Sequence, residues 1–406
     1  MASHKWRFLI LAMIQWQFLG LVSAQTTIPA TAKVPINNIK RLDDSKISIQ
    51  EIERSVTGLM ARSCVTGLGV AIFNDDKIAY LNSFGWRNKE EHLPLTADSV
   101  MYAASFTKAV FATLVAQLVT EGTLDLDKPI EAYLDKPLPD YDQYKDLATD
   151  SRYKLITLRM LLSHTAGFAN FRWLNPDKKL DIKFTPGSRY AYSGEGINLA
   201  QFIVENVTKK SVGDLIEQRI FIPLGMKNTS MTWQARFKNN LALGYDEHEK
   251  PLGHNHRSRV NAAGSMDTTL SDYAQFIEAV MQATVLSQQG KDMMLKRQIE
   301  INTASQFPTL SLVMTEENKA IQLGYGLGWG VFQTPYGGAY FKEGHDDGWE
   351  NHSVIFGDKK IGIILMSNSS NGDSIFKELL DVLIKDTYTP WKWEAYLPKN
   401  CQTTAP

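Results

Sequence analysis

The most informative stretch of the sequence covers residues 100–119 and reads VMYAASFTKAVFATLVAQLV. From residue 110 onward its apolar residues recur every three or four positions, which predicts a helix. Ser105 and Lys108 stand at the start of this helix, where a separation of three residues puts a hydroxyl and an amine on one face. A partly desolvated lysine can lose its proton and activate such a serine to accept an acyl group. The helix N-terminus would stabilise the oxyanion that forms.

The Ser-x-x-Lys spacing alone is a weak signal, because chance gives about one or two matches in a chain of this length. It occurs twice more, at Ser151 with Lys154 and at Ser374 with Lys377. The first of these pairs lies in a charged loop, and the second begins a terminal helix that we expect to face solvent. We therefore favour the pair that opens the long apolar helix, and we expect a mostly apolar pocket around it.

Apolar segments on both sides of this helix in the sequence predict strands. Segments 68–73 and 78–81 form one predicted hairpin, and segments 353–356 and 361–366 form the other. A capping box of Ser48 and Glu51 begins a helix that runs to about Ala61, and a final helix has an apolar face within 375–383.

The order of these elements predicts an α+β fold. We expect an antiparallel sheet closed by the N- and C-terminal segments and flanked by N- and C-terminal helices, with a helical lobe inserted into it. The sheet lobe would cover about 45–104 and 260–390 and the helical lobe about 105–259, within a single domain over 45–406. The catalytic cleft is expected between the lobes.

The N-terminus has the pattern of a secretory signal peptide. Lys5 and Arg7 precede an apolar run that ends in small residues, so we predict a signal peptide at 1–24 and a secreted or periplasmic protein. An uncleaved membrane anchor is the alternative, although the run is short for a span. Residues 25–44 are polar, with scattered Pro and Thr, and are expected to form a flexible lead-in.

The cysteines and histidines do not follow a metal-site pattern. Two cysteines cannot hold a zinc ion alone, the sequence has no His-Glu-x-x-His, and His254 and His256 read as surface histidines. We predict no metal and no cofactor. In an oxidising compartment Cys64 and Cys401 could form a disulfide, and two unpaired thiols are the alternative left open.

Composition and charge describe a soluble globular protein. The 406 residues are 44% hydrophobic and 21% charged, with 43 Lys and Arg against 44 Asp and Glu. This balance gives no basis for a nucleic-acid partner. We expect a small-molecule or peptide substrate, and the oligomeric state cannot be read from the sequence.

Two further clusters carry groups suited to acyl transfer. Tyr190 and Tyr192 follow a Pro-Gly turn within FTPGSRYAYSG, residues 184–194, and a tyrosine hydroxyl can pass a proton between nucleophile and leaving group. His345 lies within EGHDDGW, residues 343–349. Read alone, the tyrosines are more often packing residues, and the histidine is as often structural as functional.

In their order and separation these clusters resemble the penicillin-recognising serine hydrolases, which include class C β-lactamases, D-alanyl-D-alanine carboxypeptidases and related esterases and D-aminopeptidases. SFTK at 105–108 looks like the nucleophile motif of that family and YSG at 192–194 like its Tyr-x-Asn motif. HDD at 345–347 looks like the His-x-Gly that replaces Lys-Thr-Gly in many members. The likeness covers roughly residues 55–385 and implies a β-lactamase/DD-peptidase-like fold.

The resemblance implies a role for each matching residue. Ser105 would be the nucleophile, Lys108 and Tyr192 would handle its proton, and His345 would form a wall near the leaving side of the substrate. The backbone N–H groups of Ser105 and Gly348 would bind the oxyanion. Which of the lysine and the tyrosine is the general base stays open.

Two departures from the family pattern bear on the substrate. Gly194 stands where the family has Asn, which removes an amide that could bind an acylamide, and Asp347 stands where it has Gly. A carboxylate there would repel anionic substrates, and His345, neutral near pH 7 unless perturbed, replaces a lysine. We therefore expect an esterase or peptidase rather than a strong β-lactamase. The alternative is a weak or inactive homologue that binds a cell-wall or peptide ligand.

Overall fold

The structure is a computed structural model that describes residues 38–399 and 401. The predicted signal peptide at 1–24 and the predicted lead-in as far as residue 37 lie outside the described residues. The described residues belong to one compact unit. Among them, no helix is both long and apolar enough to span a bilayer.

The ordered fold begins earlier than the sequence predicted. Strand β1 (Asn38–Lys40) pairs antiparallel with β2 (Lys46–Ser48). Ile39 and Leu42 are fully buried in the apolar cluster that the flanking helices share. The prediction of a flexible lead-in was therefore wrong for 38–44, because two apolar side chains in a polar segment are enough to fix it against the core.

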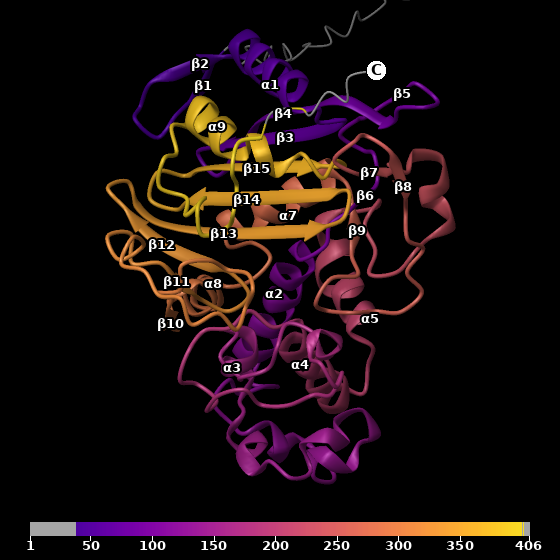
Figure 1. Cartoon of the computed structure of the whole chain (residues 1–406), viewed down its shortest axis with the longest axis vertical. Helices are drawn as coiled ribbons and strands as arrows, with labels where there is room; N and C mark the ends of the chain where they lie inside the picture. Colours follow the sequence, from indigo (N-terminus) through magenta and orange to yellow (C-terminus); the bar gives the residue numbers. More distant parts are fainter. Residues whose placement is uncertain (1–37, 400, 402–406) are drawn as a thin grey trace, which may run out of the picture. The chain divides into compact units, whose positions relative to one another are not determined.

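The sheet has nine antiparallel strands in the order β10-β11-β12-β13-β14-β15-β3-β4-β5 (Figure 1). The strands are β3 (Gly67–Asn74), β4 (Lys77–Asn88), β5 (Leu93–Pro94), β10 (Ile299–Glu300), β11 (Gly324–Tyr325), β12 (Gly330–Thr334), β13 (Gly337–Asp346), β14 (Trp349–Phe356) and β15 (Ile361–Ser367). Both predicted hairpins are present, and β15 pairs with β3. This pairing closes the sheet between the two ends of the chain and confirms the α+β prediction.

Local sequence explains the β3–β4 hairpin. Asp75 and Asp76 form its two-residue loop, and both have positive φ, 53° and 59°. Short hairpin turns need this left-handed conformation to match the twist of the strands, and Asp tolerates it better than most residues.

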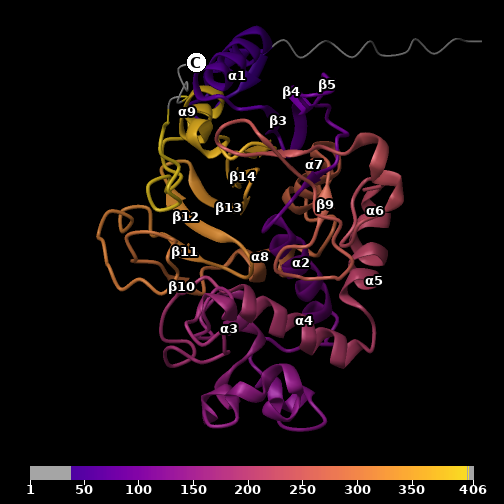
Figure 2. The ribbon, with the colours of Figure 1, turned by 45° about the vertical axis from the view of Figure 1, so that its right-hand side comes forward.

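Helices cover both faces of the sheet (Figure 2). Helix α1 (Ile49–Ser63), begun by the predicted capping box, packs with α9 (Asp373–Ile384) on one face, and α7 (Leu270–Met281) and α2 (Phe106–Thr120) lie on the other. The α9 helix does not face solvent at its start as predicted, because Ser374 is buried and bonded to the carbonyl of Asn371. Helix α2 is buried on nearly all sides.

The remaining elements build the helical part and its border with the sheet. The helices are α3 (Leu158–Leu162), α4 (Gly194–Thr208), α5 (Val212–Ile216), α6 (Ile222–Leu224) and α8 (Gln288–Leu295). Short two-stranded ladders join β6 (Met101–Tyr102) to β9 (Asp267–Thr268) and β7 (Gly244–Tyr245) to β8 (Pro251–Gly253). Single 3-10 turns make up most of 130–155.

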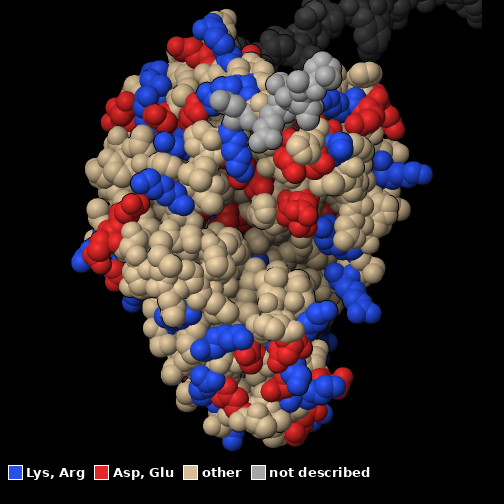
Figure 3. Space-filling view, viewed as in Figure 1, with Lys and Arg blue, Asp and Glu red and all other residues tan. Residues whose placement is uncertain are grey.

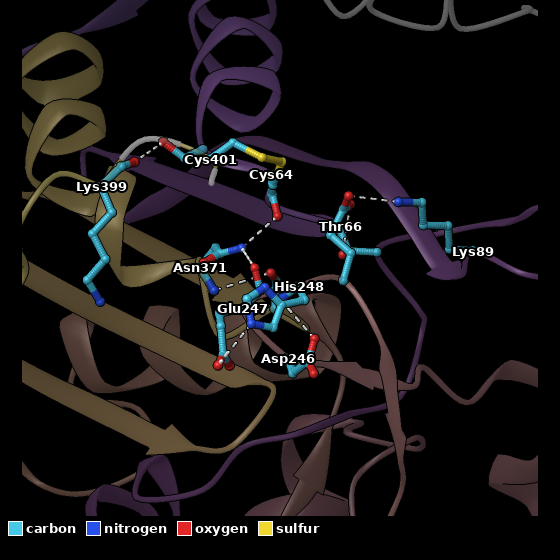
Figure 4. Close-up of a disulfide and its surroundings, with 12 residues drawn as sticks. Cys64, Thr66, Lys89, Asp246, Glu247, His248, Asn371, Lys399 and Cys401 are labelled. Atoms are coloured by element: carbon cyan, nitrogen blue, oxygen red, sulfur yellow. Dashed lines mark hydrogen bonds and ion pairs between the residues drawn. A yellow bond between two sulfur atoms is a disulfide. The ribbon is translucent and has the colours of Figure 1, made fainter. Parts of the chain in front are cut away.

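A disulfide joins Cys64 to Cys401, with a Cα–Cα distance of 5.3 Å (Figure 4). Cys64 caps the C-terminus of α1, and its carbonyl accepts a hydrogen bond from the amide of Asn371 at 3.1 Å. The bridge ties the first long helix to the last described residue of the chain. Of the two alternatives from the sequence, the disulfide is therefore the one that the structure contains.

Candidate active site

A cavity of about 890 Å³ lies at the N-terminus of α2, a size typical of small-molecule sites. Ser105, Lys108 and Tyr192 all line it. The face drawn in Figure 3 is hollowed near its centre, with acidic side chains inside and basic ones along its right-hand edge. Most of its lining surface is apolar, as expected, although ionisable side chains such as Arg257 and Glu343 also line the cavity.

Ser105 is presented to the cavity by a strained turn. It is the N-cap residue of α2, and the residue before it, Ala104, has a left-handed φ of 46°. Such a conformation costs an alanine about 1–2 kcal/mol and is typical of functional sites. The backbone N–H of Ser105 has no acceptor within the described part of the chain, so it is free to bind a ligand.

Lys108 is placed to take the proton of Ser105. Its Nζ lies 2.8 Å from Ser105 Oγ and also donates to the carbonyl of Ala263. The side chain is 1% exposed. Burial, and then the charge of nearby Lys342, lower the pKa of Lys108 well below its ordinary value. A neutral amine at this position can donate to Ala263 and accept from the serine hydroxyl at once.

Tyr192 lies beside the same lysine, whose Nζ is 4.8 Å from the centre of the Tyr192 ring. Lys342 Nζ donates to the Tyr192 hydroxyl at 3.3 Å. Burial, and then the charge of Glu343, raise the pKa of Tyr192 well above its ordinary value. The residue is therefore a neutral phenol near pH 7, which suits a proton donor better than a base.

His164 holds the backbone on both sides of this tyrosine. Its carbonyl accepts from the N–H of Ala191 at 2.8 Å, and its Nδ1 accepts from the N–H of Ser193 at 3.1 Å. Burial, and then the charges of Lys108 and Lys342, lower the pKa of His164 well below its ordinary value. A neutral ring is what this acceptor role needs, and sequence reasoning had not given His164 any role.

Sequence reasoning also missed Lys342. The lysine is fully buried, and its Nζ contacts the Glu343 carboxylate at 2.8 Å as well as the Tyr192 phenol. A side chain on Gly344 would lie 3.2 Å from the N–H nitrogen of Ser105, so only glycine lets β13 pass this close. The run Lys342-Glu343-Gly344 matches the Lys-x-Gly pattern of penicillin-binding enzymes and lies three residues before the histidine that the sequence analysis chose.

The edge of β13 is free beside Ser105. Strand β12 pairs no further than Phe341. On the other side, Asp346 pairs with Trp349 across a two-residue loop, so that pair exchanges hydrogen bonds and the next pair, His345 with Glu350, does not. The backbone N–H of His345 therefore points away from β14, toward the open edge.

His345 lines the cavity, as predicted, but it is not neutral. Its Nδ1 is 2.5 Å from Glu350 Oε1, and this hydrogen bond raises the pKa of His345 to about 9. Burial raises the pKa of Glu350 to about 7. The pair therefore presents a positively charged ring at neutral pH.

The structure does not bring Asp347 and Gly348 into the cavity lining. They form the loop between β13 and β14, where Gly348 has a φ of 81° and donates its N–H to Ser370 Oγ at 2.8 Å. Gly348 is therefore a turn residue whose N–H is already used, which corrects its prediction as an oxyanion donor. Asp347 is exposed beyond the site, so the predicted repulsion of anions from it does not apply.

Gly194 begins α4, and the space of its missing side chain is filled by the ring of Phe171. Its N–H donates to Asn170 Oδ1 at 2.9 Å. Asn170 lines the cavity. Asn170, from a different segment of the chain, therefore places a side-chain amide next to the position where the family pattern has Asn.

The loop after β8 forms another wall, with His256, Arg257 and Arg259 in the lining. His256 is exposed and stacks on Trp233. His254 is not a surface residue as predicted, because its side chain is 1% exposed and its Nε2 lies 3.0 Å from Asp267. Among residues 38–399 and 401, no group of three or more His, Cys, Asp and Glu is arranged to hold a metal ion.

Comparison with known proteins gives a consistent match. The family model described as Beta-lactamase matches residues 52–384. The chain is 26% identical over 242 residues to a beta-lactamase from Pseudomonas fluorescens, covering 57% of this chain and 64% of the relative. It is 25% identical over 329 residues to penicillin-binding protein 4* from Bacillus subtilis, covering 72% and 65%. The matches span just under two thirds of the length of these relatives.

A solved structure supports the same fold. The D-alanine carboxypeptidase AmpC from Burkholderia cenocepacia has a TM-score of 0.64 at 20% sequence identity, covering 79% of this chain and 93% of that one. At this identity the likeness concerns the fold alone.

Proposed function

This chain belongs to the beta-lactamase family, and we propose that it is an exported serine hydrolase that cleaves an ester, an amide or a D-amino-acid peptide through an acyl-enzyme on Ser105. The observation that carries the proposal is the 2.8 Å contact between Ser105 Oγ and the buried amine of Lys108, in a cavity that Tyr192 shares. Nucleophile, base and proton donor are thus within reach of one reacting carbonyl.

In the acylation step, Ser105 Oγ attacks the carbonyl carbon while neutral Lys108 accepts the hydroxyl proton. We assign the base role to Lys108 because its pKa is lowered, whereas the pKa of Tyr192 is raised. The oxyanion forms between the N–H groups of Ser105 and His345. When the tetrahedral intermediate collapses, Tyr192 gives its proton to the leaving alcohol or amine and regains one from Lys108.

In the deacylation step, water attacks the acyl-serine ester and gives its proton to the same amine and phenol pair. The acyl group leaves as a carboxylic acid, and Ser105 regains its proton. Lys342 supports both steps from behind, because its ammonium stabilises negative charge that develops on the Tyr192 oxygen 3.3 Å away.

Export is part of the proposal and is supported by two features. The first 24 residues have the pattern of a signal peptide, and the Cys64–Cys401 disulfide suits an oxidising compartment. Fractionation of cells that express the full chain, with mass spectrometry of the mature N-terminus, tests this part.

A substrate panel tests the activity. Purified mature protein would be assayed with short-chain 4-nitrophenyl esters, a D-Ala-D-Ala peptide and a chromogenic cephalosporin. We expect turnover of the esters and weak cephalosporin hydrolysis, together with a fluorophosphonate adduct on Ser105. Labelling or turnover that persists in Ser105→Ala would contradict the assignment.

The second candidate is a catalytically weak or inactive homologue that binds a cell-wall or peptide ligand. Its motivation is the departure at Gly194, where the family pattern has an amide side chain; in this chain Asn170 places an amide beside that position. This candidate predicts binding of D-Ala-D-Ala peptides by wild type without any ester turnover. Ester turnover that disappears in Lys108→Ala would exclude it.

A further inference from the structure

Residues of strand β13 contact successive parts of the cavity along the direction of the strand. Lys342 and Gly344 are two residues apart, so they point to the same side of the sheet. Lys342 contacts the hydroxyl of Tyr192, and Gly344 lies against the N–H of Ser105. Because a strand advances about 3.3 Å per residue, the Cα atoms of Lys342 and Gly344 are about 7 Å apart along the strand.

The same strand reaches a cationic wall on the other side of the nucleophile. Asp346 is two residues beyond Gly344 and again points to this side. Its Oδ2 lies 3.9 Å from Arg257 Nη2. Ser105 therefore lies between the phenol at one end of this line and Arg257 at the other.

The mouth of the cavity near Tyr192 has a wall of aromatic side chains, while the Lys342–Glu343 pair is buried behind the phenol. Phe307 packs edge-on against Tyr192, with ring centres 5.7 Å apart, and is 48% exposed. Phe171 fills the space beside Gly194 and stacks on Trp173, which is 59% exposed. All three aromatic residues line the cavity. Since Tyr192 protonates the leaving group in the proposed mechanism, this apolar wall is the one that the leaving group meets.

The opposite end carries two guanidinium groups. Arg257 is held in place by stacking on Tyr102, 3.3 Å from its ring centre, and by a 3.3 Å hydrogen bond to the carbonyl of Asn255. Arg259 also lines the cavity, is exposed, and has no hydrogen bond or ion pair within the described part of the chain.

The acidic groups near this wall lie beside Arg257 and not beside Arg259. Asp267 lies 3.6 Å from Arg257, but it is fully buried and also bound to His254. Asp346 is the exposed acid of this wall, at 3.9 Å from the same arginine. Arg259 is left without a partner and can pair with an anion bound in the cavity.

From this arrangement, and resting on the proposed function, we propose that the acyl part of the substrate carries an anionic group that binds Arg257 and Arg259, and that the leaving group is apolar or aromatic. The substrate class is then an ester or amide of a dicarboxylic acid, cleaved at one end. In β-lactams and D-Ala-D-Ala peptides the carboxylate belongs instead to the amine that leaves the acyl carbon. That carboxylate would meet the apolar wall, so such compounds should be poor substrates.

Two matched esters test the proposal. Mono-(4-nitrophenyl) adipate and 4-nitrophenyl hexanoate have the same aromatic leaving group and the same acyl chain length, and they differ only in a terminal carboxylate against a methyl group. Adipate is chosen because shorter dicarboxylic monoesters cyclise spontaneously. We expect kcat/KM to be at least about tenfold higher for the adipate ester, the effect of one hydrogen bond to a charged group. Added salt should reduce this ratio.

Variants connect the preference to the wall. Arg259→Gln should reduce the ratio about tenfold, mainly by lowering kcat/KM for the adipate ester, because the variant removes the charge that the carboxylate would meet. Arg257→Lys should retain part of the preference that Arg257→Gln loses. Arg54→Gln is the matched control, since Arg54 is an exposed residue of α1 outside the cavity lining and should have no effect.

The outcomes separate this inference from the function on which it rests. Equal rates for the two esters, or a preference that survives in Arg259→Gln, would overturn the inference and leave the hydrolase assignment intact. If neither ester is cleaved, the hydrolase assignment fails. Binding of the two esters to Ser105→Ala then tests the anion site independently of catalysis. Calorimetric affinities that do not differ would reject the anion site, and at least about tenfold tighter binding of the adipate ester would support it.

Discussion

Two buried lysines meet at Tyr192, and their surroundings differ in one respect. Lys108 has a serine hydroxyl and a carbonyl as partners and no acid in contact, whereas Lys342 lies 2.8 Å from the carboxylate of Glu343. Burial lowers the pKa of both amines, and Glu343 opposes this effect most strongly at Lys342. A single carboxylate thus separates a lysine that can act as a base from one that stays a cation.

This comparison also shows what makes a buried charge permanent. Lys342 and Glu343 offset the cost of desolvation by forming a hydrogen-bonded ion pair. Gln306 Nε2 also donates to Glu343 Oε1 at 2.9 Å. Lys108 instead avoids the cost by losing its proton. The same side chain therefore has two functions in one cavity, and substitutions at the two positions should have different consequences.

The largest effect is expected from Lys108→Met, which keeps the length of the side chain and removes the base. We expect kcat/KM for 4-nitrophenyl esters to fall by about 10³–10⁴, the range for loss of a general base. The folded state should be as stable as wild type or more stable, because the variant removes an amine without an ionic partner from the core. Ester hydrolysis and urea denaturation measure the two effects. A variant that is both active and destabilised would refute the role of Lys108.

The pH dependence of the wild type tests the same role. Ester hydrolysis should rise with pH as Lys108 loses its proton, and the midpoint should lie well below the ordinary pKa of lysine because burial lowers it. A rise centred near the ordinary lysine value would mean that the amine is solvated.

The second effect in size is expected from Lys342→Met, the same substitution at the paired lysine. We expect kcat/KM to fall by about 10², because the phenol loses the ammonium that stabilises negative charge on it. Unlike Lys108→Met, this variant should lose about 3–5 kcal/mol of stability, since Glu343 is left buried without a counter-ion. Equal stability of the two variants would show that the Lys342–Glu343 pair does not matter to the fold.

Only one of these lysines could be found from the sequence, and the reason is geometric. The contact between Ser105 and Lys108 is local, because three residues on a helix always bring two side chains together. The contact of Lys342 with Tyr192 joins segments 150 residues apart and depends on the fold that brings β13 beside the Tyr192 segment. Its signal, a Lys-x-Gly run, was present but stood close to a histidine that matched another pattern.

The difference between local and long-range contacts also explains which features of the fold could be predicted from the sequence. The two hairpins and the capping box at Ser48 are local patterns, and the structure contains them. The ordered segment 38–44 and the turn role of Gly348 depend on which distant residues pack beside them. Neither could be derived from spacing alone.

A smaller effect is expected from Glu343→Gln, which makes the second lysine resemble the first. Glutamine keeps hydrogen bonds to Lys342 and Gln306 but removes the negative charge that raises the pKa of Lys342. Lys342 should then lose its proton at lower pH, and because the proposed mechanism needs its ammonium, kcat/KM should begin to fall at lower pH than in wild type. Steady-state kinetics from pH 5 to 10 measure this shift. Glu343→Asp, which keeps the charge, is the control, and an unchanged profile in Glu343→Gln would contradict the argument.

The smallest effect on rate is expected from His164→Asn, which tests whether the two lysines act on a tyrosine that is fixed in place. The asparagine oxygen can accept the Ser193 N–H in place of Nδ1, so we expect kcat/KM within about threefold of wild type. His164→Leu cannot accept this bond, and a buried N–H without a partner costs about 1–3 kcal/mol. That variant should lose stability by this amount and activity by about tenfold, because Tyr192 is no longer held between Lys108 and Lys342. If both variants lose activity equally, His164 acts through its ring rather than through the backbone it holds, and the positions of the two amines alone would not explain catalysis.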